Sequence, residues 1–181
     1  MSRPDPAPTM TDSITPCILL GVDPGLNRTG YAVLEHHPAG PVLREGGVIR
    51  STAKRPLAER VGEISGGLEE VMRQYSPTVM AIEQVFSHAQ YPRAAILMAH
   101  ARGAILDLAN RMGLSIANYA PREIKRLLTG SGAANKEQVQ RAVSQELGLD
   151  HLLEPNDVAD AFAVALCHYH QRRNQYLQLW K

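Results

Sequence analysis

The sequence predicts a single α/β domain built on a mixed five-stranded sheet flanked by helices. Three observations carry this prediction. Three short β-branched segments joined by tight turns come first, and from residue 57 the apolar period becomes helical, with two further short strands between the helices. The third observation is the length of the chain: 181 residues with 44% hydrophobic content suffice for one well-buried domain but not for two of ordinary size.

The first three strands are expected over residues 17–23, 29–36 and 42–50. Pro24-Gly25 separates the first from the second, and the Pro-Ala-Gly-Pro segment 38–41 separates the second from the third. Connections this short favour antiparallel pairing of the three strands.

The first helix follows Pro56. Its apolar positions recur at helical spacing: Leu57, Val61, Ile64, Leu68, Val71 and Met72. Ser76-Pro77 ends it, and residues 78–83 are short, apolar and β-branched enough for a buried strand.

The remaining elements alternate helix and strand before ending in helices. They are a helix opened by Pro92 through about Met112, a strand over 114–119, a helix from Pro121 to Gly130, a helix capped by Asn135 through Leu147, and a last helix capped by Asn156. The order β-β-β-α-β-α-β-α-α-α predicts three antiparallel strands followed by right-handed parallel crossovers.

The domain is expected to span residues 17–171. Residues 1–16 are rich in Pro, Ser, Thr and Asp and predict a disordered N-terminal tail, and residues 172–181 predict a C-terminal tail. The N-terminus lacks the basic-then-apolar order of a signal peptide, and no apolar stretch approaches the roughly 20 residues that cross a bilayer. We therefore expect a cytoplasmic protein with no membrane partner.

Bulk charge does not indicate a nucleic-acid partner. Nineteen basic and eighteen acidic residues give a formal charge of +1, so such a partner requires a local basic surface. Cys17 and Cys167 lie in apolar runs without metal-ligand spacing. They are typical of reduced thiols in a core, with a disulfide as the alternative.

Four carboxylates lie where an apolar chain should not carry charge. Asp23 and Glu83 end two predicted strands, and Asp157 and Asp160 open the last helix three residues apart, on one face. Charged carboxylates beside a core need compensation, which a divalent cation with oxygen ligands provides. Without Cys or an ordered His pattern, the set favours Mg²⁺ or Mn²⁺ over Zn²⁺.

Each acid also has a structural explanation. Asp23 before Pro-Gly is typical of an ordinary turn, and Glu83 could pair with a distant arginine. Acidic residues in a first helical turn favour the helix dipole, which accounts for Asp157 better than for Asp160. The convergence of all four is what favours a site.

Three motifs resemble those of RuvC, the bacterial Holliday junction resolvase family. They are Gly21-Val22-Asp23-Pro24-Gly25 with Thr29-Gly30, Ala81-Ile82-Glu83-Gln84-Val85-Phe86, and Asp157-Val158-Ala159-Asp160-Ala161. They lie in the family's order and spacing over about residues 17–170. The resemblance implies a ribonuclease H-like fold and a dimeric, metal-dependent endonuclease that nicks two strands of a four-way DNA junction symmetrically.

By the same resemblance, Asp23, Glu83, Asp157 and Asp160 are the metal-binding catalytic acids. Two cations would promote phosphodiester hydrolysis and leave a 5′-phosphate and a 3′-hydroxyl. Some relatives have His in place of Asp157. The expected setting is homologous recombination and DNA repair, with the branch-migration proteins RuvA and RuvB as partners.

Five residues are candidates for DNA contact. Phe86 lies in a polar loop after Glu83, and the resemblance favours base stacking over an anchor folded onto the core. Lys125 and Lys136 flank a Gly-Ser-Gly loop and could contact phosphates, although isolated lysines usually serve solubility. Arg28 and Arg93 are weaker candidates for the same surface.

Small residues are concentrated in the predicted helix over 92–112: Ala94, Ala95, Ala99, Ala101, Gly103 and Ala104. They allow close approach either to the protein's own sheet or to a second copy. Symmetric incision requires two active sites, and this favours the dimer contact.

Three other functions stay open. Asp23-Pro24-Gly25 with Gly30 is similar to the first phosphate loop of actin-like and sugar-kinase ATPases, but those proteins pair two such domains. A non-catalytic DNA-binding module would lack metal-dependent nicking. Another ribonuclease H-like nuclease would prefer RNA–DNA hybrids to junctions.

Overall fold

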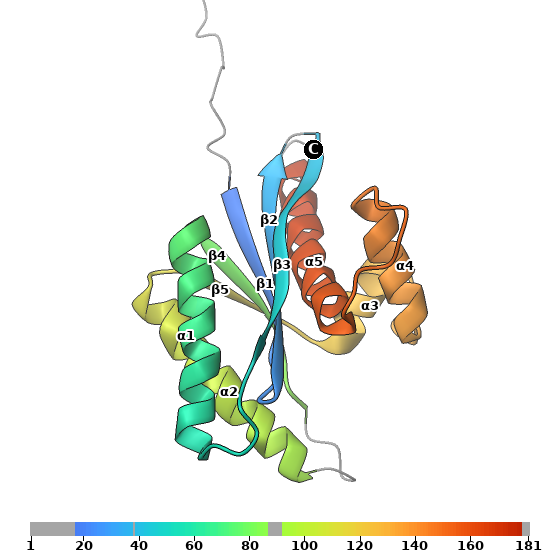
Figure 1. Ribbon diagram of the computed structural model, residues 1–181. Helices are drawn as coiled ribbons and strands as arrows, with labels where there is room; N and C mark the ends of the chain where they lie inside the picture. The colour runs from blue at the N-terminus through green and yellow to red at the C-terminus, as the bar shows by residue number, and fades with distance from the viewer. Residues whose placement is uncertain (1–16, 38, 87–91, 179–181) are drawn as a thin grey trace, which may run out of the picture.

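The computed structural model describes residues 17–37, 39–86 and 92–178 (Figure 1). In chain order the elements are β1 (Cys17–Asp23), β2 (Arg28–His37), β3 (Gly40–Arg50), α1 (Leu57–Tyr75), β4 (Val79–Glu83), α2 (Pro92–Arg111), β5 (Ser115–Tyr119), α3 (Pro121–Thr129), α4 (Lys136–Glu146) and α5 (Asn156–Gln178). The expected order of strands and helices is confirmed.

The sheet has the strand order β3-β2-β1-β4-β5. β1 pairs with β2, and β2 with β3, in antiparallel fashion. β4 pairs in parallel with β1 on one side and with β5 on the other. This confirms the mixed five-stranded sheet and places β1 and β4, the two strands that end in acids, side by side at its centre.

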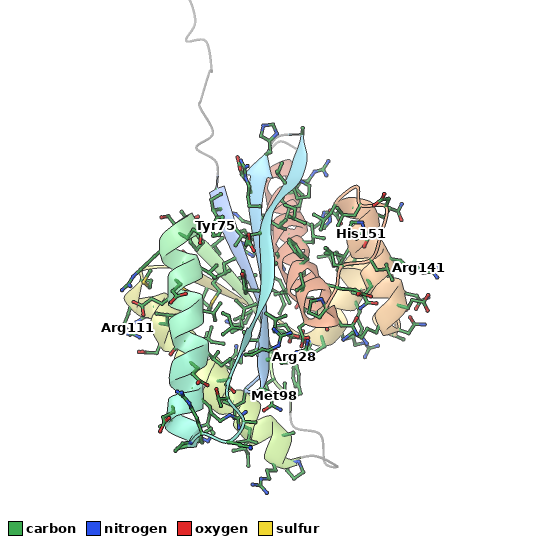
Figure 2. All side chains as sticks on the ribbon, in the orientation of Figure 1. Arg28, Tyr75, Met98, Arg111, Arg141 and His151 are labelled. Carbon is green, nitrogen blue, oxygen red and sulfur yellow. The ribbon has the colours of Figure 1, made fainter. Side chains whose placement is uncertain are left out.

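Helices cover both faces of the sheet. α1 and α2 lie on one side, and α5 with α3 and α4 lies on the other (Figures 1 and 2). Alternate residues of β4 point to opposite faces of the sheet. Met80 and Ile82 pack into the core beneath α1 and α2, whereas Val79 and Ala81 pack into the core beneath α5. By this alternation the next residue, Glu83, belongs to the α5 face.

Two glycines seat α5 on the sheet. A Cβ at Gly21 would lie 2.4 Å from the carbonyl oxygen of Ala161, and a Cβ at Gly30 would lie 2.0 Å from that of Asp157. A side chain at either position would push the helix away. Gly21 and Gly30 therefore allow the first turns of α5 to approach β1 and β2 closely.

The helix ends agree closely with the sequence. Asn135 caps α4 in a reciprocal capping box, in which its side chain and that of Gln138 each accept the other's backbone N–H at 2.9 Å. Gly130, in the left-handed conformation, ends α3. Asn156 differs from expectation: it is the first residue of α5, and its Oδ1 accepts a hydrogen bond from Gln140 Nε2 at 2.7 Å.

The structure tests the expected domain boundary at the C-terminal end but not the one at the N-terminal end. The tail expected over residues 1–16 lies outside the described residues. α5 continues to Gln178, past the boundary expected at residue 171. Within the described residues, Cys17 and Cys167 are free thiols and no helix has the length and apolarity needed to cross a membrane.

Candidate metal centre

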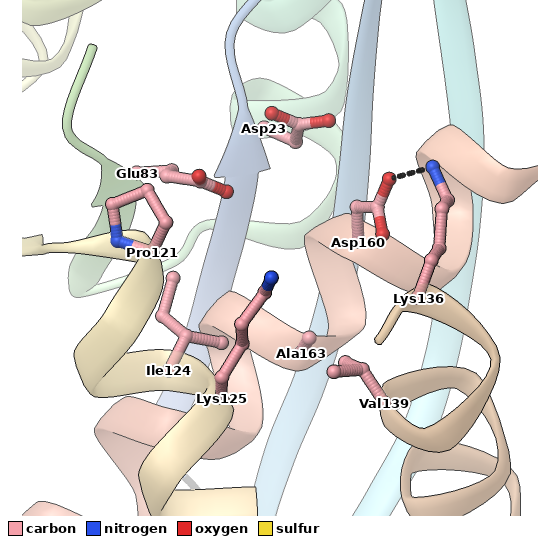
Figure 3. A pocket seen from close by; sticks show the side chains of 9 residues that line it. All are labelled: Asp23, Glu83, Pro121, Ile124, Lys125, Lys136, Val139, Asp160 and Ala163. Atoms are coloured by element: carbon pink, nitrogen blue, oxygen red, sulfur yellow. Dashed lines mark hydrogen bonds and ion pairs between the residues drawn. The ribbon is translucent and has the colours of Figure 1, made fainter. Parts of the chain in front are cut away.

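Asp23 and Glu83 lie next to each other at the carboxyl ends of the central strands. Val22 pairs with Ile82 in the parallel ladder, and each acid is the next residue of its strand. Both side chains line a pocket of about 240 Å³ (Figure 3). Its lining residues are Asp23, Glu83, Pro121, Ile124, Lys125, Lys136, Val139, Asp160 and Ala163.

The first turns of α5 supply the other two acids. Asp160 lines the pocket, and its Oδ2 lies 2.7 Å from Lys136 Nζ. Asp157 lies beside the pocket, with Oδ2 3.2 Å from a terminal nitrogen of Arg28. The structure thus brings three of the four predicted acids onto one pocket and places the fourth within electrostatic reach of Asp23.

Burial and mutual repulsion dominate the electrostatics of these acids. Burial raises the pKa of Asp23 to about 8, aided by repulsion from Glu83, Asp160 and Asp157 and opposed by Lys136. Burial also raises the pKa of Glu83 to about 7, aided by Asp160 and opposed by Lys125 and Lys136. The pocket therefore favours added positive charge.

This donor set suits a hard divalent cation. Its ligating atoms are carboxylate oxygens, the ligand type of Mg²⁺ and Mn²⁺. Within the described ranges, no three His, Cys, Asp or Glu side chains already form a metal-binding group. Lys136 bonds to Asp160 (Figure 3), and Arg28 bonds to Asp157. A cation would take over the compensating role of these basic groups.

The structural explanations for Asp23 and Glu83 do not fit this geometry. Asp23 is too strongly desolvated for an ordinary exposed turn residue. The Glu83 carboxylate has no ion pair among the described residues. An arginine does contact Glu83, but at the main chain: Arg102 Nε donates to its carbonyl oxygen at 3.1 Å.

The candidate DNA contacts surround the pocket unevenly. Lys125 and Lys136 line it, and Arg28 pairs with Asp157 beside it. Phe86 is 54% exposed, so it is not an anchor folded onto the core. Arg93 is exposed near the start of α2 and does not line the pocket. The polar loop at 87–91 lies outside the described residues.

Several residues at the site were missed by the sequence reasoning. Pro121 and Ile124 of α3, Val139 of α4 and Ala163 of α5 form its apolar wall. The apolar period of each helix marks such residues as buried but does not say which of them face a pocket. Arg102 carries no local signal, because nothing in its spacing within α2 indicates a contact with the end of β4.

The turn after β1 does not form an open phosphate loop. The Thr29 hydroxyl donates to the Gly25 carbonyl at 2.7 Å and lies 3.2 Å from the Gly25 N–H, so the turn is closed by its own side chain. The space above Gly30 is filled by the backbone of Asp157. These contacts disfavour the reading of this turn as an ATPase phosphate loop.

Comparison with known proteins identifies the family. The family described as "Crossover junction endodeoxyribonuclease RuvC" matches residues 19–168. The chain is 47% identical over 156 residues to the protein of that name from Rhodopirellula baltica, covering 86% of this chain and 88% of the relative. It is 44% identical over 151 residues to the one from Chlorobium chlorochromatii, covering 83% of this chain and 78% of the relative.

Solved structures agree. RuvC of Thermus thermophilus matches with a TM-score of 0.78 and 34% identity, over 87% of this chain and 96% of that one. The same protein in complex with a Holliday junction substrate matches with a TM-score of 0.80 and 32% identity, over the same shares of both chains. The ribonuclease H-like fold implied by the three sequence motifs is confirmed, and the chain belongs to the RuvC family of metal-dependent crossover junction endodeoxyribonucleases.

Proposed function

We propose that this protein resolves four-way DNA junctions by symmetric paired nicks that leave 5′-phosphate and 3′-hydroxyl ends. The observation that carries the proposal is the acid pocket at the ends of β1 and β4, with Asp23, Glu83 and Asp160 on its walls and two lysines beside them. Its family and its likeness to a RuvC bound to a Holliday junction substrate support the choice of substrate.

The proposed cofactor is Mg²⁺ or Mn²⁺, two ions per site, held by Asp23, Glu83, Asp160 and Asp157. When bound, such ions supply electrostatic stabilisation to in-line hydrolysis of a phosphodiester. The acids must be ionised to hold them, and the raised pKa values of Asp23 and Glu83 make ionisation depend on added positive charge.

Basic side chains would place the scissile strand. Lys125 and Lys136 project from two helices into the pocket and offer point charges to a phosphate (Figure 3). Arg28 at the start of β2 and Arg93 near the start of α2 would extend this contact along the backbone of the DNA. Only Lys125 and Lys136 line the pocket itself, and such a local basic surface is compatible with a net charge of only +1.

Phe86 would stack on an unpaired base at the junction. Its exposed ring lies three residues after Glu83. We expect Phe86→Ala to lower the single-turnover rate of junction cleavage roughly tenfold or more, because stacking contributes about 1–3 kcal/mol per base. Mn²⁺ affinity without DNA should not change. A wild-type cleavage rate in Phe86→Ala would exclude this role.

A homodimer would provide the two sites that paired nicks require. The outer surface of α2 exposes Ile96, Ala99 and Gly103, which follow helical spacing, and a Cβ at Gly103 would meet nothing within 4 Å. An exposed isoleucine beside small residues suits close helix approach across a two-fold axis. Ala101, in contrast, is buried against the protein's own core.

The wider setting follows from the family. We propose that the protein acts in the cytoplasm in recombination and repair, alongside the branch-migration proteins RuvA and RuvB. The resemblance of the motifs supports these partners.

The proposal is tested with a synthetic mobile four-way junction. The protein is incubated with the junction, with a linear duplex and with an RNA–DNA hybrid, each with Mg²⁺, Mn²⁺ or chelator. We expect metal-dependent nicks in two opposed strands of the junction, and ligase should seal the products directly. Preferential cleavage of the hybrid would indicate a different ribonuclease H-like nuclease. Saturable ATP binding without nicking would indicate an actin-like or sugar-kinase-type ATPase.

A further inference from the structure

Arg102 joins the catalytic end of β4 to the helix on the opposite face of the sheet. It belongs to α2, and its Nε donates a hydrogen bond to the main-chain oxygen of Glu83 at 3.1 Å. A terminal nitrogen of the same guanidinium donates to Asn118 Oδ1 on β5. One rigid fork thus holds Glu83 and the neighbouring strand together.

This contact lies where β4 loses its pairing with β1. The ladder with β1 ends at the pair Val22–Ile82, one residue before Glu83. On the other side, Glu83 pairs with Tyr119, and the Gln84 N–H donates to the main-chain oxygen of Tyr119 at 2.9 Å. Ends of elements open more readily than their middles, so a side-chain contact here adds to the one-sided pairing with β5 in holding the end of β4.

The partners of Arg102 are unusual for a half-buried cation. Within the described residues no ion pair joins it to a carboxylate. It contacts an uncharged carbonyl and an uncharged amide instead. A charge placed against dipoles on two strands is better explained by the geometry it imposes than by an attraction between charges.

We propose that Arg102 is a positioning residue for Glu83: through the Glu83 carbonyl it fixes the end of β4 and thereby the aim of the Glu83 carboxylate into the acid pocket. The inference rests on the proposed function, because it assigns to Glu83 a role in holding the cation. Outer partners of metal ligands typically change metal affinity or activity 10–100-fold when removed.

The test is Arg102→Lys, which keeps the charge and most of the stem but loses the fork. Its matched control is Arg111→Lys on the same helix, where the arginine pairs with Asp107 at 2.9 Å on the surface. Mn²⁺ affinity is measured by calorimetry without DNA. Junction affinity is measured in Ca²⁺, and the single-turnover cleavage rate in Mg²⁺.

For Arg102→Lys we expect Mn²⁺ affinity and cleavage rate to fall by about 10- to 100-fold, with junction affinity within about twofold of the wild-type value. Arg111→Lys should match the wild type in all three. In Arg102→Ala, added guanidinium at concentrations below denaturing should restore part of the Mn²⁺ affinity, a result that a general loss of folding would not give.

If the arginine variants fail to fold, the Mn²⁺ affinity of Asn118→Ala provides a second test of the proposal. This substitution removes one partner of the fork and should weaken Mn²⁺ binding in the same direction by a smaller factor. Wild-type Mn²⁺ affinity in Arg102→Lys or, if that variant is unfolded, in Asn118→Ala would overturn the inference. Failure of the wild-type protein to cut junctions would refute the proposed function instead, and the Mn²⁺ titrations would still decide the role of Arg102.

Discussion

Asp23 shows how the position of one side chain creates a functional group. A carboxyl with an ordinary pKa of 3.8 is raised to about 8 because it is buried and faces three other acids. Such a group is neutral in the metal-free protein near pH 7 and ionises when positive charge arrives. Binding of a cation and loss of a proton are therefore coupled at this site.

This coupling predicts how stability depends on pH. Because folding raises the pKa of Asp23, its stabilising contribution is complete below about pH 4 and is lost as the pH rises towards 8. Asp23→Asn removes the titration. In chelator, we expect the variant to match the wild type near pH 4 and to exceed it by on the order of 3 kcal/mol at pH 8.5.

The measurement is urea unfolding of both proteins across this range. Mn²⁺ at pH 8.5 should stabilise the wild type much more than Asp23→Asn. Parallel stability curves for the two proteins in chelator would show that Asp23 is not desolvated in the folded state.

Lys136 compensates the pocket before any metal arrives. Its ammonium lies 2.7 Å from Asp160 and also lowers the pKa values of Asp23 and Glu83. Lys136→Met should therefore raise Mn²⁺ affinity without DNA, by about threefold to tenfold for this half-exposed pair. It should also slow junction cleavage, because a phosphate contact is lost.

The matched control is Arg141→Met, since Arg141 lies on the same helix and pairs with Glu137 on the surface. It should leave Mn²⁺ affinity unchanged. Weaker Mn²⁺ binding in Lys136→Met would mean that the lysine helps to hold the site together instead of competing with the cation.

At the scale of elements, the position of α5 decides whether the acids meet. The parallel register of β1 and β4 brings Asp23 and Glu83 together. Asp160 lies on α5, far along the chain, so its position depends on how this helix packs on the sheet. Gly21 and Gly30 let that helix contact the strands backbone to backbone. The glycines of the first motif thus serve the site by permitting close packing and not by contacting a ligand.

The helix α2 connects two proposed roles. One surface carries Arg102, which reaches the end of β4, and another carries Gly103 among exposed small residues. We expect Gly103→Arg to be monomeric by sedimentation equilibrium, because the added side chain has room in the monomer but blocks helix approach. Paired nicking of one junction should give way to single nicks.

Gly62→Arg on α1 is the control, because Gly62 is also helical, exposed and free of neighbours within 4 Å of a Cβ. It should sediment as the wild type does. A dimeric Gly103→Arg would place the subunit contact elsewhere.

At the scale of the whole molecule, local signals predicted the fold and long-range packing completed the site. The strand boundaries followed from turn residues such as Pro24-Gly25, and the helix ends from Asn135 and Gly130. These signals act within a few residues and can be read from sequence.

The contacts of individual side chains could not be read in the same way. Asn156 was expected to cap α5 and instead accepts from Gln140, and Arg102 was not singled out at all. Both contacts join elements distant in sequence, and no local pattern specifies such partners. The pairing of Lys136 with Asp160 likewise depends on how α4 and α5 pack.

The central claim is that carboxylates from β1, β4 and α5 act together to cut DNA with the help of divalent cations. The most direct measurement compares wild-type protein and Asp23→Asn on one labelled four-way junction under single-turnover conditions in Mg²⁺ or Mn²⁺. We predict equal junction binding and a cleavage rate lower by roughly a thousandfold or more in the variant. Cleavage by Asp23→Asn near the wild-type rate would contradict the claim.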